Sequence, residues 1–65
     1  MNNVKQFRNS RKMTLEQVAE KAGTSKSYIY EIERFTSTPN IQLAYRIAKA
    51  LKTPVTKVFP PIAEG

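Results

Sequence analysis

The chain contains no cysteine and no histidine, and only two of its 65 residues are glycine. The missing side chains exclude disulfides, thiol nucleophiles, imidazole catalysis and the common zinc sites. Its apolar runs are far shorter than the roughly 20 residues that a membrane-crossing helix needs, and the N-terminal MNNVKQF lacks the apolar segment of a signal peptide. We therefore expect a cytoplasmic protein that is not an enzyme and that holds no metal or other cofactor.

Acidic residues are also scarce, since five of them face eleven lysines and arginines, for a net charge of +6. A basic balance of this kind favours polyanions, with nucleic acid before an acidic membrane surface. A helix that lies on a membrane needs one continuous amphipathic stretch with bulky apolar residues. Here the basic residues are spread over several short capped segments, so we expect a nucleic-acid partner and no membrane.

The segment MTLEQVAEKAGTSKSYIYEIE, residues 13–33, predicts two short helices joined by a tight turn. Thr14 and Gln17 form a capping-box pattern that begins the first helix. Gly23 can adopt the left-handed conformation that ends it, and Ser25 can cap a second helix over about 26–33. Two helices separated by three turn residues are typical of the helix-turn-helix motif.

The second of these helices presents an outward face that suits nucleic acid. Ile29 and Ile32 lie one turn apart and form its apolar pair. The opposite side carries hydroxyl, aromatic and charged groups: Lys26, Ser27, Tyr30, Glu31 and Arg34. Such groups can reach base edges and phosphates in the major groove. An ordinary solvated helix face is the alternative interpretation of the same residues.

A further helix is predicted before this pair. We expect Asn3 to cap a helix that runs to about Lys12 and turns Val4 and Phe7 toward the core. Arg11 and Lys12 in its last turn should face water. There they can complement the helix dipole or contact phosphate.

Two more helices are predicted after the pair. Asn40 is expected to cap a helix over about 41–52. Its apolar spacing predicts a stripe that faces the core: Ile41, Ala44, Ile47, Ala48 and Leu51. Thr53 and Pro54 can supply the cap and the first residue of a last short turn. That turn should direct Val55, Val58 and Phe59 inward.

The stretches SKSYIYEIER (25–34) and TPNIQLAYRIAKAL (38–51) carry a resemblance to a known family. With five helices in this order, the chain resembles the Cro/CI-type, or XRE, helix-turn-helix proteins, and its turn and second helix resemble those of biofilm-type repressors. The resemblance implies an all-α, lambda-repressor-like bundle of five short helices over residues 1–59, with the helix-turn-helix at about 14–33. Residues 60–65 would be a short tail.

The resemblance also implies which residues meet DNA. Lys26, Ser27 and Glu31 are the base-facing positions, with Tyr30 beside them. Phosphates or flanking DNA would be met by Ser25, Tyr28, Arg34, Thr36 and Ser37. For Ser25 a role as helix cap alone is the alternative, and Tyr28 can be half buried on the flank of the apolar side.

A structural pair is implied as well. Arg8 of the first helix would form an ion pair with Glu33 at the end of the recognition helix, which is the second helix of the motif at about 26–33. A fork-shaped guanidinium can hold a carboxylate there. If the pair forms, Arg8 is a structural residue and not a DNA contact. Two independent exposed charges are the alternative.

Two residues depart from the family pattern. Leu15 stands where the family commonly has a glutamine that contacts phosphate, and we expect it to pack instead. Phe35 stands where glycine or asparagine is usual, and it cannot adopt positive φ cheaply. We therefore expect a reshaped turn, in which Phe35 packs on the core, contacts a partner subunit or meets a thymine methyl group.

These observations predict a regulator of transcription that binds double-stranded DNA in a sequence-specific manner. The resemblance to the Cro/CI-type family implies that it is a repressor. One recognition helix reads few base pairs, so we expect a homodimer on a palindromic operator. Its subunit contact would use residues 35–39, the start of the fourth helix and residues 55–62. We call the outward side of the recognition helix its reading face. Glu31 on this face keeps an alternative open, namely a protein-binding module of antitoxin or antirepressor type.

Overall fold

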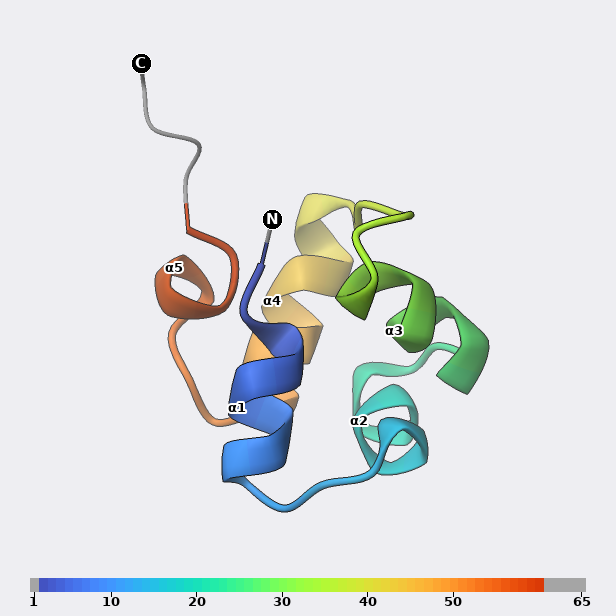
Figure 1. Ribbon diagram of the computed structural model, residues 1–65. Helices are drawn as coiled ribbons and strands as arrows, with labels where there is room; N and C mark the ends of the chain where they lie inside the picture. Colours follow the sequence, from blue (N-terminus) through green and yellow to red (C-terminus); the bar gives the residue numbers. More distant parts are fainter. Residues whose placement is uncertain (1, 61–65) are drawn as a thin grey trace.

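The computed structural model describes residues 2–60, which form five helices and no strand. The helices are α1 (Val4–Ser10), α2 (Leu15–Ala22), α3 (Lys26–Glu33), α4 (Ile41–Ala50) and α5 (Val55–Val58). In Figure 1, α4 runs through the middle of the bundle, with α1 and α5 on one side and α2 and α3 on the other. The predicted all-α class is confirmed. Of the tail expected at 60–65, residues 61–65 lie outside the described part of the chain.

Every helix contributes to one apolar core. The fully buried side chains are Val4, Val18, Ile29, Ile32, Ile47, Leu51 and Val58. Phe7, Leu15, Val55 and Phe59 are partly buried and pack against them, as predicted. Burying such side chains is the main source of stability for a small domain without disulfides. No helix within residues 2–60 is long and apolar enough to cross a membrane.

The caps of the helix-turn-helix are as predicted. The Thr14 hydroxyl accepts from the Gln17 amide at 3.0 Å, and the Gln17 side chain accepts from the Thr14 amide at 2.8 Å. Gly23 ends α2 in the left-handed region with φ 76°. The Ser25 hydroxyl accepts from the amide of Tyr28 and so begins α3. These local bonds fix the direction in which α3 leaves the turn.

The N-terminal cap is a correction. Asn3 precedes α1, but its side chain makes no capping bond. The Asn2 side-chain oxygen accepts from the Val4 amide instead, while the Asn3 side chain donates to the Lys57 carbonyl at 2.9 Å. The prediction was wrong because α5 offers Asn3 a partner that is distant in sequence. The residues just before α1 are therefore hydrogen-bonded to α5.

The ends of two helices and the start of α5 also differ from the predictions. α1 ends at Ser10 and α4 at Ala50, two residues earlier than expected in each case. Pro54 is the N-cap of α5 rather than its first residue. The Thr53 hydroxyl does not cap α5, since it donates to the Leu51 carbonyl.

Ile41 is a further correction, because it is 73% exposed although the stripe predicted it inward. It is the first residue of α4, and that end of the helix extends past the core that Ala44 and Ile47 reach. The Asn40 side chain accepts from the Leu43 amide, as predicted. Burial of the stripe therefore begins one turn into α4.

Four helices end in the same left-handed conformation, although only one of the residues involved is glycine. The residues with positive φ are Lys12, Gly23, Phe35 and Lys52. After α3, the Phe35 amide donates to the Ile32 carbonyl and the Thr36 amide to the Glu31 carbonyl. This is the paired bonding of a Schellman motif, which satisfies carbonyls that the helix end leaves free.

Phe35 therefore corrects the expectation of a reshaped turn. It adopts φ 65° and keeps the geometry that glycine usually takes. The bonds made by the Phe35 and Thr36 amides hold it there against the steric cost. The residue is 53% exposed, so packing on the core, one of its three expected roles, is wrong, while contact with a partner subunit or with a thymine methyl group stays a prediction. The ring is left at the surface of the loop between α3 and α4.

Replacing Phe35 with glycine is expected to stabilise the domain by about 1 kcal/mol, because a left-handed residue with a Cβ costs roughly that much. The melting temperature should rise by roughly 4–8 °C for a domain of this size. Phe35→Ala is the matched control, since it removes the ring and keeps the Cβ. If the glycine variant melts no higher than the alanine variant, the strain assigned to φ 65° is absent.

Candidate nucleic-acid interface

The outward face of α3 presents the four base-facing candidates together. Lys26, Ser27, Tyr30 and Glu31 are all exposed. The opposite face of the helix is held by Ile29 and Ile32, which are fully buried. The helix is thus fixed by its core side, while hydrogen-bonding groups lie along its solvent side.

Tyr30 and Arg34 form a pair at the C-terminal end of this face. The Arg34 guanidinium lies 5.5 Å from the centre of the Tyr30 ring, and its Nη1 donates to the Tyr30 hydroxyl at 3.2 Å. A guanidinium has five donors, and this bond uses one of them. The pair holds Arg34 beside the reading face, where its other donors can meet phosphate.

Three of the expected flanking residues have hydroxyl groups that are hydrogen-bonded to other parts of the chain, all at the surface. Thr36 Oγ1 donates to the Glu31 carbonyl at 3.0 Å, and Ser37 Oγ donates to the Glu31 carboxylate at 2.9 Å. The Tyr28 hydroxyl donates to the Thr38 carbonyl at 3.4 Å, and its ring is half-buried. These bonds tie the loop after α3 onto the helix and hold the Glu31 carboxylate in place.

Ser25 lies at the other end of α3, where its hydroxyl oxygen accepts the capping bond and its proton is left for a further acceptor. The N-terminus of a helix attracts phosphate through its free amides and its dipole. Ser25 can therefore cap α3 and donate to a phosphate at the same time.

Arg8 and Glu33 form a nearly buried ion pair that joins α1 to the end of α3. Arg8 Nε donates to one carboxylate oxygen at 2.6 Å and Nη2 to the other at 3.2 Å, while Nη1 donates to the Met13 carbonyl at 2.9 Å. The Arg8 and Glu33 side chains are 14% and 4% exposed. The structure thus contains a fork-shaped pair rather than two independent surface charges, and Arg8 is not displayed toward a ligand.

Arg11 has a role that sequence reasoning missed. Its guanidinium was expected to face water, yet Nε donates to the Leu51 carbonyl at 2.9 Å and Nη2 to the Lys52 carbonyl at 3.1 Å. It therefore satisfies carbonyls at the end of α4, not at the end of its own helix. The sequence holds no local signal for this contact, because the two helices meet only in the folded chain.

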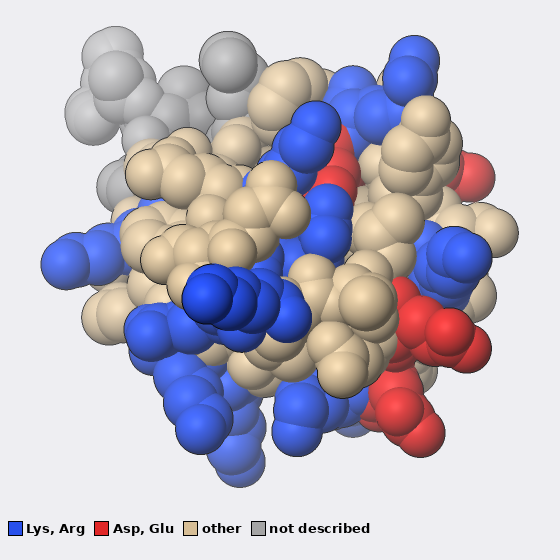
Figure 2. Space-filling view, turned by 60° about the horizontal axis from the view of Figure 1, so that its bottom comes forward, with Lys and Arg blue, Asp and Glu red and all other residues tan. Residues whose placement is uncertain are grey.

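The charges around α3 nearly cancel. Lys26 and Arg34 carry two positive charges, the exposed Glu31 carries one negative charge, and the exposed Glu16 and Glu20 of α2 carry two more. Figure 2 shows lysines and arginines spread over much of the face drawn there, while glutamates gather toward one side of it. Most of the net charge of +6 therefore lies away from α3.

Comparison with known proteins identifies the family. A family model described as helix-turn-helix matches residues 4–58, from the start of α1 to the end of α5. The chain belongs to this helix-turn-helix family. Within this family the chain is of the XRE type, in agreement with the resemblance seen in its sequence. In such proteins the second helix of the motif enters the major groove of DNA, and in this chain that helix is α3.

Three relatives show how far the likeness extends. The chain is similar to the HTH-type transcriptional regulator SinR of Bacillus subtilis, with 40% identity over 53 residues, 80% of this chain and 48% of SinR. It is 34% identical to the HTH-type transcriptional regulator SutR of Escherichia coli over 58 residues, 89% of this chain and 33% of SutR. An uncharacterized HTH-type transcriptional regulator of Archaeoglobus fulgidus is 30% identical over 56 residues, 86% of this chain and 79% of that protein. The chain thus spans less than half the length of SinR and SutR.

Proposed function

We propose that the protein regulates transcription by binding double-stranded DNA in a sequence-specific manner, with α3 in the major groove. The observation that carries the proposal is the exposed face of α3, on which Lys26, Ser27, Tyr30 and Glu31 lie together in a helix-turn-helix of the matching family. Relatives named as transcriptional regulators support it. The role needs no catalytic group or cofactor, and such a regulator would act in the cytoplasm as a repressor.

Each base-facing residue has a chemical counterpart in the major groove. Lys26 can donate to guanine O6 and N7, and the Glu31 carboxylate can accept from a cytosine amino group. The Ser27 hydroxyl can serve as donor or acceptor at several base edges. Ser25 and Arg34 flank these positions and can meet phosphates, which set the position of the helix without reading sequence.

A homodimer on a palindromic operator is the assembly that we propose, because one helix reads only a few base pairs. Half-sites would lie about one helical turn, roughly 34 Å, apart. Ile41 and Tyr45, one turn apart on α4, are 73% and 58% exposed, and Phe35 is 53% exposed. Exposed apolar side chains of this size suit a contact between subunits.

The same apolar side chains favour one alternative, a module that binds another protein in the manner of an antitoxin or antirepressor. Salt distinguishes the two functions. DNA binding should weaken steeply with salt, with a log–log slope near one per phosphate neutralised. Binding of a partner through apolar contacts should change far less.

Selection of bound sequences from a random duplex pool at near-physiological salt tests the proposal. We expect an enriched inverted repeat, whose half-site spacing reports the dimer. A pool that is retained at low salt but shows no enriched sequence would contradict sequence-specific binding. Retention of a protein partner together with no retention of DNA would favour the alternative.

A further inference from the structure

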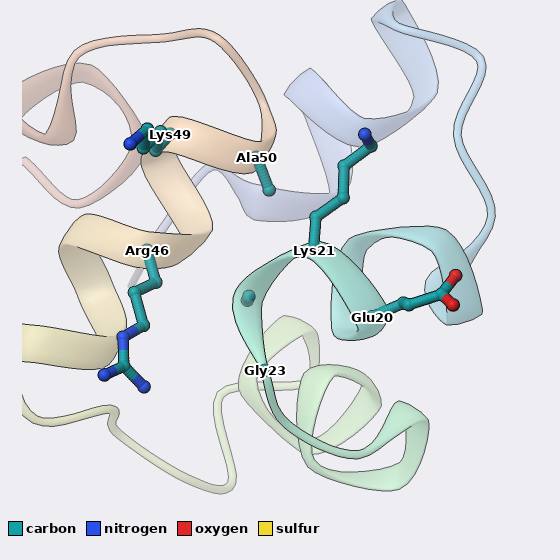
Figure 3. A pocket seen from close by; sticks show the side chains of 7 residues that line it. Glu20, Lys21, Gly23, Arg46, Lys49 and Ala50 are labelled. Atoms are coloured by element: carbon teal, nitrogen blue, oxygen red, sulfur yellow. The ribbon is translucent and has the colours of Figure 1, made fainter.

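A groove between the ends of α2 and α4 gathers positive charge away from the reading face of α3. Lys21, Arg46 and Lys49 line it, and we call these three residues the α2–α4 basic groove. Figure 3 shows Lys21 on α2 and the other two on α4, with Gly23 at the end of α2 and Ala50 at the end of α4. A neighbouring hollow shares Lys21 and Ala50 with the groove and adds Arg11, Lys12 and Lys52. Six of the eleven basic residues of the chain therefore lie in this region.

These charges are not neutralised within the described residues. There, the ion pair found within 4.0 Å is Arg8–Glu33, and none of the three groove cations has a carboxylate that close. Glu20 also lines the groove, but its side chain extends away from Arg46 and Lys49 (Figure 3). All three cations are exposed to solvent. The groove is therefore open to an anionic ligand.

Helix dipoles do not account for so much charge. Lys21 and Lys49 lie in the last turns of α2 and α4, where a cation offsets the partial negative charge of the helix end. Each end carries roughly half an elementary charge, so the two ends together offset about one of the three positive charges. A clear surplus is left for a partner.

The groove lies next to the turn that leads into α3. A Cβ built on Gly23 would be 3.9 Å from Arg46 Nη1, so the guanidinium lies over the turn of the helix-turn-helix. Gly23 precedes Lys26, the first residue of α3, by only three positions. Arg46 therefore lies beside the segment that leads into the N-terminal end of α3.

We infer that the α2–α4 basic groove binds the sugar–phosphate backbone of the same duplex, beyond the base pairs that α3 reads. The inference rests on the proposed function and adds to it a sequence-independent contact. It assigns most of the electrostatic attraction for DNA to the groove, because the charges on and around α3 nearly cancel.

The lining of the groove favours duplex backbone over other polyanions. Besides the charged residues it consists of Ala22, Gly23 and Ala50, with no aromatic ring. Single-stranded nucleic acid is usually held by bases stacked on aromatic side chains. A protein partner usually needs a large apolar or aromatic anchor. Phosphates need only cations at the right spacing.

The test compares two variants with the same change in charge. Arg46→Gln with Lys49→Gln alters the groove, and Lys5→Gln with Lys57→Gln alters exposed lysines on α1 and α5 as the matched control. Affinity is measured by fluorescence anisotropy across salt concentrations, on a scrambled duplex of about 30 base pairs and on a duplex recovered by selection. Thermal melting checks that both variants fold.

We expect the groove variant to lower the log–log salt slope by about two on both long duplexes, close to 0.9 per lost phosphate contact, and the control variant by less than half of that. The ratio of the two affinities should stay unchanged, since backbone contacts carry no sequence information. On a duplex shortened to the base pairs that α3 reads, the groove variant and the control variant should have the same salt slope.

Three results would overturn the inference: equal slope changes in the two variants, a difference that persists on the shortened duplex, or single-stranded RNA that competes better than duplex DNA. The scrambled duplex lets the groove be tested even if selection enriches no sequence. Failure of the groove inference can therefore be distinguished from failure of the proposed function.

Discussion

Replacing Arg8 with alanine is expected to lower the free energy of unfolding by about 3–5 kcal/mol, the cost of leaving a buried charge without its partner. The Glu33 side chain is only 4% exposed and accepts two bonds from Arg8. A domain of this length holds roughly 3–10 kcal/mol in total. The variant should therefore unfold at a much lower temperature, and DNA binding should be lost together with the fold.

Thermal and urea unfolding measure this effect, and Lys5→Ala on the exposed side of α1 is the control. The double variant Arg8→Met, Glu33→Met should recover much of the lost stability, because it removes both charges and fills similar volume. A single Arg8→Ala variant that melts like the wild type but no longer binds DNA would contradict the structural role and make Arg8 a DNA contact.

Lys26→Ala and Ser27→Ala should each remove a base preference while leaving the fold intact. Both side chains are exposed on α3. A specific contact to a base edge discriminates by about 1–3 kcal/mol, or roughly 5- to 150-fold in relative affinity. Each variant should lose preference at one position of the half-site, and its melting temperature should stay within about one or two degrees of the wild type.

Selection from the random pool, repeated with each variant, measures these preferences. Lys57→Ala on α5 serves as the control, since it removes the same charge from an exposed site. We expect the control variant to recover the same sequences as the wild type. If Lys26→Ala instead weakens binding equally on all duplexes, Lys26 contacts a phosphate rather than a base.

Local signals in the sequence were sufficient for the helix-turn-helix. The capping box of Thr14 and Gln17, the left-handed Gly23 and the Ser25 cap each depend on residues within four positions of one another. Bonds over such short separations form wherever the segment folds as a helix. The bounds of α3 followed from them.

Contacts between distant segments could not be predicted in the same way. Asn3 bonds to Lys57 and Arg11 to the carbonyls after α4, and in both cases the partner comes near only in the folded chain. Phe35 shows a different limit, because the bonds that end α3 outweigh the local preference against positive φ.

The placement of the side chains of the candidate site followed from the sequence only in part. The residues of α3 that could face bases were apparent from helical periodicity, whereas the bonds from Thr36 and Ser37 to Glu31 appear only once the loop is folded back. Arg46 lies far from Lys21 in sequence, so their shared groove left no pattern to detect.

Reading of DNA sequence by α3 is tested most directly by the ratio of two wild-type affinities at one near-physiological salt concentration. One affinity is for the duplex recovered by selection, and the other is for a scrambled duplex of equal length. We expect the recovered duplex to bind at least about a thousandfold more tightly, as specific sites usually do. Equal affinities for the two duplexes would contradict it.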